Sequence, residues 1–186
     1  MHPQLAAIVA DFEAAQQRLH RVAAATPDAR WAARHDPDRW SVAECVAHLN
    51  LTGRAYVPLL RDGIAAARTI GGGAPRRYRR DPIGWLIGVM SGPMLRIGGR
   101  KIGRTRTAAA FVPGGELPRD TVLAAFASLQ REQIALVAKA DGLPIHRARV
   151  TSPFDARVRY NLYAALVLLP RHQHRHLEQA EEVWST

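Results

Sequence analysis

Apolar residues recur at helical spacing along four long stretches of the chain. The stretches cover residues 4–25, 41–70, 119–140 and about 157–184, and in each one the apolar side chains share one face. The stretches end at strong stop signals: Thr26-Pro27-Asp28, the glycine run 71–73 followed by a proline, and Asp141-Gly142-Leu143-Pro144. The pattern therefore predicts four amphipathic helices.

The second of these helices has a defined start. Ser41 and Glu44 have the spacing of a capping box, in which each side chain accepts a hydrogen bond from the other residue's backbone N–H. Trp40 stands where a hydrophobic staple would pack against Cys45. Pro58 predicts a kink or a break late in this helix, because proline removes one backbone hydrogen bond.

Residues 76–118 are less regular. They include the basic cluster Arg76–Arg80, the apolar stretch 82–90 and a second basic run from Arg96 to Arg106, and the part from Ala108 onward reads as an extended loop and turn. We interpret the apolar stretch as a short amphipathic helix that packs over the domain's own core. A partner subunit and a membrane surface are the alternatives.

Four amphipathic helices with short 1–2 and 3–4 links predict an all-α fold, a four-helix bundle. The insert 76–118 forms a long crossover that permits helices 2 and 3 to run parallel. The chain has 186 residues, 47% of them hydrophobic and 6% aromatic, which suits one helical domain over residues 1–186.

Charge and composition limit the function classes. The net charge of +10 suits an anionic partner or an arginine-rich proteome, but no groove-reading motif is present, so we expect no specific nucleic acid. The sequence has no run of about 18 apolar residues, so we expect no transmembrane helix. The N-terminus lacks the apolar core of a signal peptide. Cys45 is the single cysteine, which is typical of a reducing, cytoplasmic protein.

Three of the eight histidines lie within five residues of one another, in the fourth predicted helix. His172 and His176 are four residues apart and share a face, whereas His174 is turned to roughly the opposite side. An H-x-x-x-H pair on a charged helix more often lies on a solvent-exposed face than in a metal site. Here, however, His172 and His176 continue the apolar stripe, and His48 falls on the apolar stripe of the second helix.

Three neutral imidazoles from two helices would hold a divalent transition metal such as Zn, Ni, Cu or Fe and leave positions open for water or substrate. Gln179, Asn50 or Glu44 could support the ligands from a second sphere, although Glu44 has the competing capping role. Nothing near Cys45 suggests a base, so we interpret it as a buried core residue.

Two pieces of the sequence resemble the DinB/YfiT-like superfamily. They are Arg39-Trp40-Ser41-Val42-Ala43-Glu44-Cys45-Val46-Ala47-His48-Leu49 and His172-Gln173-His174-Arg175-His176-Leu177-Glu178-Gln179. The segments from Arg106-Thr107 to Pro113 and Ser152-Pro153-Phe154 are similar as well. The resemblance implies that His48, His172 and His176 bind a divalent metal. Pro170, two residues before His172, departs from a regular helix and predicts a kink there.

The same resemblance implies a metal-dependent enzyme. Relatives include metal-dependent hydrolases and S-transferases that use bacillithiol, mycothiol or glutathione, with the metal activating the thiol. We therefore expect a thiol S-transferase acting on a small molecule, with Arg54 or the cluster Arg76–Arg80 attracting an anionic cosubstrate. The alternatives are a non-catalytic metal-binding or stress-response module and a hydrolase. An exposed segment from Trp85 to Met90 would favour a homodimer.

Overall fold

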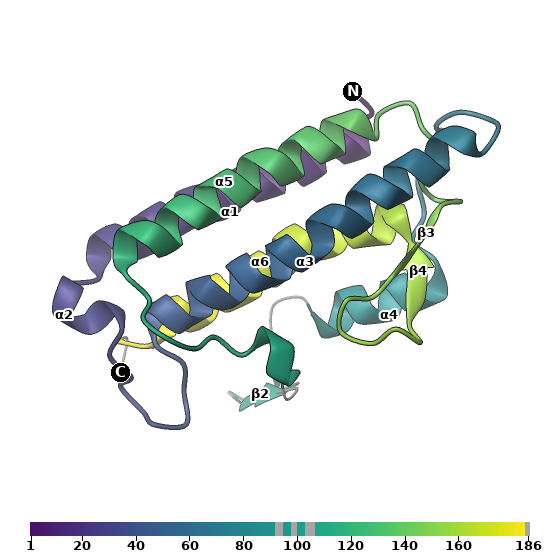
Figure 1. Cartoon of the computed structure of the whole chain (residues 1–186). Helices are drawn as coiled ribbons and strands as arrows, with labels where there is room; N and C mark the ends of the chain where they lie inside the picture. Colours follow the sequence, from purple (N-terminus) through teal and green to yellow (C-terminus); the bar gives the residue numbers. More distant parts are fainter. Residues whose placement is uncertain (92–94, 98–99, 103–106, 185–186) are drawn as a thin grey trace.

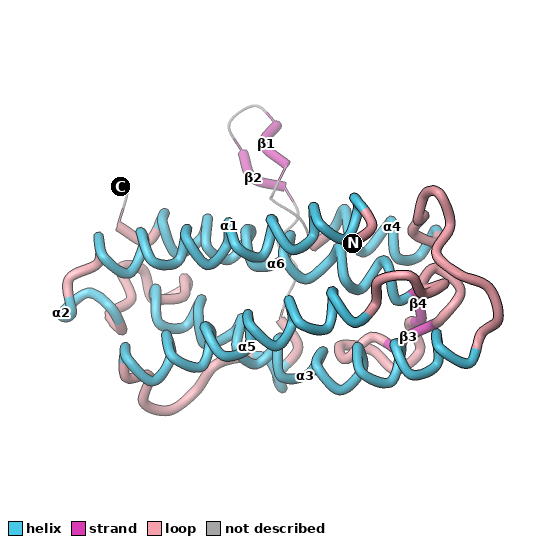
Figure 2. The backbone as a smooth tube through the Cα atoms, turned by 90° about the horizontal axis from the view of Figure 1, so that it is seen from above, coloured by secondary structure: helices cyan, strands magenta, loops and turns pink. Residues whose placement is uncertain are grey.

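The computed structural model describes residues 1–91, 95–97, 100–102 and 107–184, and it has the predicted all-α, four-helix-bundle architecture (Figure 1). The long helices are α1 (Pro3–Ala25), α3 (Val42–Thr69), α5 (Arg119–Lys139) and α6 (Leu162–Glu182). Helices α3 and α5 run in the same direction, and α1 and α6 run in the opposite one (Figure 1). Both α1 and α3 pack against both α5 and α6, as the view along the perpendicular direction shows (Figure 2).

Shorter elements connect the bundle. The first link contains α2 (Asp28–Trp31), and the crossover between α3 and α5 contains α4 (Pro82–Met90) and the 3₁₀ helix η1 (Ala109–Phe111). Helix α4 confirms the predicted short helix in the crossover. Between α4 and η1 lies the antiparallel pair β1 (Leu95–Ile97) and β2 (Arg100–Ile102), while the rest of the predicted basic run from Arg96 to Arg106 lies outside the described residues.

The predicted start of the fourth helix is wrong by five residues. A second antiparallel hairpin precedes it, formed by β3 (Arg149–Thr151) and β4 (Arg159–Asn161) with Val150 opposite Tyr160. Helix α6 then begins after Asn161, whose side chain accepts a hydrogen bond from the N–H of Ala164. The strand pairing is favoured over an earlier start of the helix because it buries both Val150 and Tyr160.

Of the kink or break predicted at Pro58, the break does not occur, because α3 remains one helix as far as Thr69. The residues on either side of this proline, Tyr56, Val57 and Leu60, are buried in the core, and their packing outweighs the single missing backbone hydrogen bond. Helix α6 likewise continues through Pro170 to Glu182. The capping box of Ser41 and Glu44 is confirmed, with both reciprocal hydrogen bonds present.

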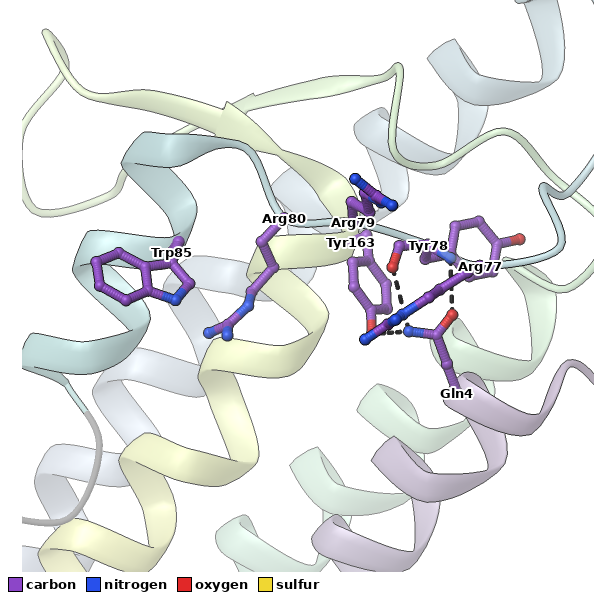
Figure 3. A pocket seen from close by; sticks show the side chains of 7 residues that line it. All are labelled: Gln4, Arg77, Tyr78, Arg79, Arg80, Trp85 and Tyr163. Carbon is purple, nitrogen blue, oxygen red and sulfur yellow. Dashed lines mark hydrogen bonds between the residues drawn. The ribbon is translucent and has the colours of Figure 1, made fainter.

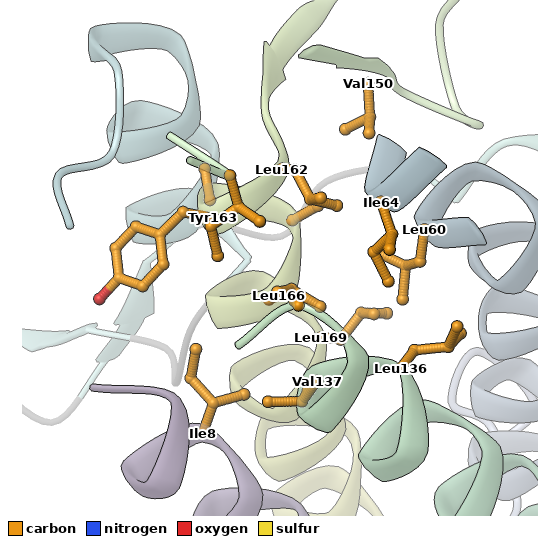
Figure 4. Close-up of a cluster of buried hydrophobic side chains, with 14 of the residues drawn as sticks. Ile8, Leu60, Ile64, Leu136, Val137, Val150, Leu162, Tyr163, Leu166 and Leu169 are labelled. Carbon is orange, nitrogen blue, oxygen red and sulfur yellow. The ribbon is translucent and has the colours of Figure 1, made fainter. Parts of the chain in front are cut away.

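Two apolar clusters fill the bundle, one towards each end. The cluster at the end where α6 begins includes Leu60, Leu136 and Leu166 (Figure 4), and the other includes Cys45, Phe126 and Leu177, with Trp40 packed on its edge. Between the clusters every long helix except α1 contributes buried polar side chains: His48, Thr52, Gln130, Gln133, Gln173 and His176. The bundle therefore contains a polar layer at mid-length, and the candidate site lies in it.

Candidate metal centre

The bundle brings the three predicted histidines together. His48 comes from α3, while His172 and His176 stand one turn apart on α6, which packs directly against α3. Their nearest candidate ligand atoms all lie within 4.8 Å of one another, and the Nε2 atoms of His48 and His172 are 3.4 Å apart. Histidine side chains from two neighbouring helices therefore converge on one point, as the sequence predicts.

A backbone carbonyl orients His48. Its Nδ1 lies 2.8 Å from the carbonyl oxygen of Phe111 in η1. Because a carbonyl oxygen can only accept, Nδ1 carries the proton and the lone pair is left on Nε2, which faces the other two histidines. This contact joins residues 63 positions apart in the chain. No local pattern in the sequence indicates it.

All three imidazoles are held in the neutral form. His48 and His176 are buried, with 2% and 8% of their surfaces exposed, and His172 is partly exposed. Loss of hydration lowers the pKa of His48, and together with the neighbouring imidazoles it lowers the pKa of His176 well below its ordinary value. The same causes, with a contribution from Arg175, lower the pKa of His172 to about 3. Neutral imidazole is the form that binds a metal.

Aromatic rings surround the three histidines. Trp40 stacks on His176 with ring centres 5.9 Å apart and also contacts His48 at 5.0 Å. On the other side Phe154, from the loop of the β3–β4 hairpin, lies 6.4 Å from His172 and 4.4 Å from Phe111. The sequence marks Trp40 as a staple and as part of the resemblance, and Phe154 only as part of the resemblance. Their role as the walls of this site comes from the tertiary structure.

The residues proposed to support the ligands occupy different positions. Gln179 interacts with His176 and opposes the lowering of that residue's pKa. Asn50, in contrast, donates from Nδ2 to the carbonyl of Val122 on α5, 3.0 Å away. Glu44 has its carboxylate engaged by the backbone of Ser41 and by the guanidinium of Arg34. Of the three, Gln179 is therefore the one placed to act on a ligand.

His174 and Cys45 lie near the site but do not belong to it, as the sequence predicts. His174 is turned away from the other histidines, and its Nε2 lies 3.2 Å from the backbone oxygen of Asp11. Cys45 is buried, and the loss of hydration raises the pKa of its thiol to about 12, so it is not a nucleophile at neutral pH.

The donor set fits a divalent transition metal. The Nδ1 atoms of His172 and His176 are buried and find no hydrogen-bond partner among the residues that the structure describes. The nitrogen of His172 that faces His48 is Nε2, 3.4 Å from Nε2 of His48, and a bound cation would use the lone pairs that converge there. Three nitrogen donors would leave further coordination positions open, and the partly exposed His172 marks the side from which solvent reaches the site.

Comparison with known proteins gives one match. A sequence model of the DinB superfamily matches residues 11–180, which includes all three histidines and both helices that carry them. No curated protein and no solved structure matches the chain.

Proposed function

The chain belongs to the DinB superfamily, and on that premise we propose that it is a metal-dependent enzyme that transfers a low-molecular-weight thiol to a small electrophile. His48, His172 and His176 hold the metal, and Gln179 supports His176. The observation that carries the proposal is the convergence of three neutral imidazoles, two buried and one partly buried, whose ligand atoms lie within 4.8 Å of one another.

The chain's own residues perform three tasks in such a reaction. The Phe111 carbonyl fixes the tautomer of His48, so that its Nε2 is free to bind. Trp40 and Phe154 exclude water from two sides, and the partly exposed His172 leaves an entrance. A metal bound here would lower the pKa of a thiol or a water molecule at its open position. The single buried cysteine and this chemistry suit a reducing cytoplasm.

A metal-dependent hydrolase and a non-catalytic metal-binding or stress-response module are the competing functions. The hydrolase would activate water at the same open position, and the binding module would hold metal without turnover. The structure favours an accessible site over a sealed one only through the exposure of His172. Thiol transfer is thus distinguished from these two by its cosubstrate.

Metal analysis of protein purified without a histidine tag tests the ligand assignment. We expect about one metal ion per chain in the parent protein and strong depletion in His48→Ala and His172→Ala. His174→Ala is the matched control, because His174 lies on the same helix and faces away from the site. Stoichiometric metal that persists in both site variants would refute the ligand set.

A screen of glutathione, mycothiol and bacillithiol against a model electrophile then tests the reaction. Metal-dependent thioether formation, abolished in His172→Ala and retained in His174→Ala and Cys45→Ser, supports thiol transfer. Hydrolysis of an ester or amide without any thiol requirement would assign the site to the hydrolase, and metal binding without turnover of either kind would assign it to the binding module.

A further inference from the structure

Helix α4 packs in an unusual way against α6. Its buried positions are Gly84 and Gly88 rather than its large side chains. A Cβ added to Gly84 would lie 2.3 Å from the Cβ of Ala164, and one added to Gly88 would lie 2.7 Å from Nη1 of Arg80. The backbone of α4 is therefore pressed against its neighbours. The predicted packing over the domain's own core is made by these glycines and by Ile87, which is partly buried against the core, while the other large side chains of α4 are not buried.

The other large apolar residues of α4 face outwards. Those that are exposed, with the exposed fraction of each, are Ile83 (46%), Trp85 (54%), Leu86 (52%), Val89 (48%) and Met90 (52%). At about 100° per residue, Leu86 lies opposite the glycine pair and the others flank it. A contiguous exposed apolar face of this kind is typical of an interaction site.

Arginines border this face and line a pocket beside it. The pocket has a volume of about 370 Å³, and its lining includes Trp85 together with Arg77, Arg79 and Arg80 (Figure 3). Nη1 of Arg80 is buried against Gly88 of α4 and has no hydrogen-bond partner in the described part of the chain. A pocket lined by three arginines is suited to an anion such as a phosphate.

Hydrogen bonds hold the wall of the pocket in place, and its nearby acidic residue is already paired. Gln4 bonds the backbone of Tyr78 through both of its amide atoms and also donates to the hydroxyl of Tyr163, which holds the segment carrying the arginines against α1 and α6. Asp81, the acidic residue that begins α4, is occupied by the N–H of Gly84 and by an ion pair with Arg149. Asp81 is therefore not available to neutralise the arginines that line the pocket.

The arginine-lined pocket is separate from the candidate metal centre. Tyr163 lies in the pocket and precedes His172 by nine residues on α6 (172 − 163 = 9), which places the two on opposite faces of the helix. They are also about 13 Å apart along its axis. The cluster Arg76–Arg80 is consequently not at the mouth of the metal centre, where it was expected to attract a cosubstrate.

We propose that α4 and the cluster Arg76–Arg80 form a docking surface for an anionic lipid bilayer. The apolar face of α4 enters the boundary between headgroups and acyl chains, with Trp85 at headgroup level, and the arginine-lined pocket receives a lipid phosphate. The net charge of +10 directs the protein towards a negatively charged surface. Among the described residues no helix is long and apolar enough to cross the bilayer, so the contact is peripheral.

A second copy of this chain is the competing occupant, and the charges disfavour it. A second copy carries the same net charge of +10 and the same basic border, so it offers no negative charge to complement Arg76–Arg80. An anionic bilayer instead complements both parts of the surface, the apolar helix and the basic border. The charge pattern thus selects the lipid surface over the homodimer.

Vesicle co-sedimentation with the full chain tests the proposal. We expect binding to phosphatidylglycerol-containing vesicles and little binding to pure phosphatidylcholine. Arg77→Gln combined with Arg79→Gln should weaken binding about 25-fold, because each arginine near an anionic surface contributes roughly fivefold. Arg80 is left in place because it packs on Gly88. Arg21→Gln combined with Arg131→Gln removes the same charge from other exposed positions and should have a much smaller effect.

Leu86→Gln combined with Val89→Gln tests the apolar face, and both positions are exposed, so folding should be unaffected. All four tryptophans lie in the described residues, and Trp85 is the exposed one. On vesicles its fluorescence emission should therefore shift to the blue and be quenched by brominated lipids. Unchanged helicity by circular dichroism verifies each variant. Absence of vesicle binding, or binding unaffected by both α4-region variants, overturns the proposal. Dimerisation abolished by Leu86→Gln/Val89→Gln, without vesicle binding, assigns the face to a second copy.

Discussion

Replacing Tyr160 by phenylalanine should destabilise the protein more than replacing Tyr56, although both changes delete the same hydrogen bond. The two hydroxyls lie 2.5 Å apart, and the residues are 1% and 0% exposed. Burial raises the pKa of both, so both remain neutral hydroxyls at physiological pH. The bond ties α3 to the β3–β4 hairpin, whose loop places Phe154 beside His172.

The magnitudes follow from what each variant leaves behind. In Tyr56→Phe the hydroxyl of Tyr160 still interacts with the side chain of Ser152, so the loss is that of one neutral bond, about 1 kcal/mol. In Tyr160→Phe the hydroxyl of Tyr56 is buried with no other partner in the described part of the chain, which costs about 2–3 kcal/mol. The corresponding decreases in Tm are about 2–4 °C and about 4–12 °C for a chain of this size.

Urea denaturation of the metal-free protein, followed by circular dichroism at pH 7, measures both losses and that of the double variant. We expect the double variant to be less destabilised than the sum of the single ones, by about 1 kcal/mol, because no unpaired hydroxyl remains. Equal losses for the two single variants, or strict additivity in the double one, would refute the reasoning.

Three further predictions concern the site, the core and α4. In metal-free protein the free energy of unfolding should fall as the pH decreases below about 6.5. The three site histidines have lowered pKa values when folded, so they take up protons only on unfolding. A series of urea titrations at different pH values measures this dependence, and a free energy of unfolding that does not change in that range contradicts it. Cys45 should resist thiol reagents until the protein is denatured, since its pKa is about 12 and it is buried, and rapid labelling of the native protein would show otherwise. Gly84→Ala should displace α4, because the new methyl group would clash with Ala164. The displacement should lower Tm and increase proteolysis between residues 76 and 91. An unchanged Tm would contradict this packing.

Much of the fold was predictable because it depends on local patterns. A helix that buries one face must repeat its apolar residues with the helical period, and a capping box requires only residues three apart, so the long helices and the start of α3 at Val42 could be derived from the sequence. The errors occurred where long-range packing decides. Pro58 does not break α3, and the stretch before α6 forms a strand because Val150 and Tyr160 become buried together.

The candidate site shows the same division. The sequence by itself determined which histidines lie on apolar faces, and hence that His48, His172 and His176 point inwards, because helical periodicity is a property of the chain alone. Only the tertiary structure decided that the Phe111 carbonyl orients His48, that Trp40 and Phe154 enclose the site, and that the glycines of α4 face the bundle while most of its large side chains face solvent. Periodicity identifies a face of a helix but not what meets it, since that depends on residues distant in the chain that are adjacent only after folding.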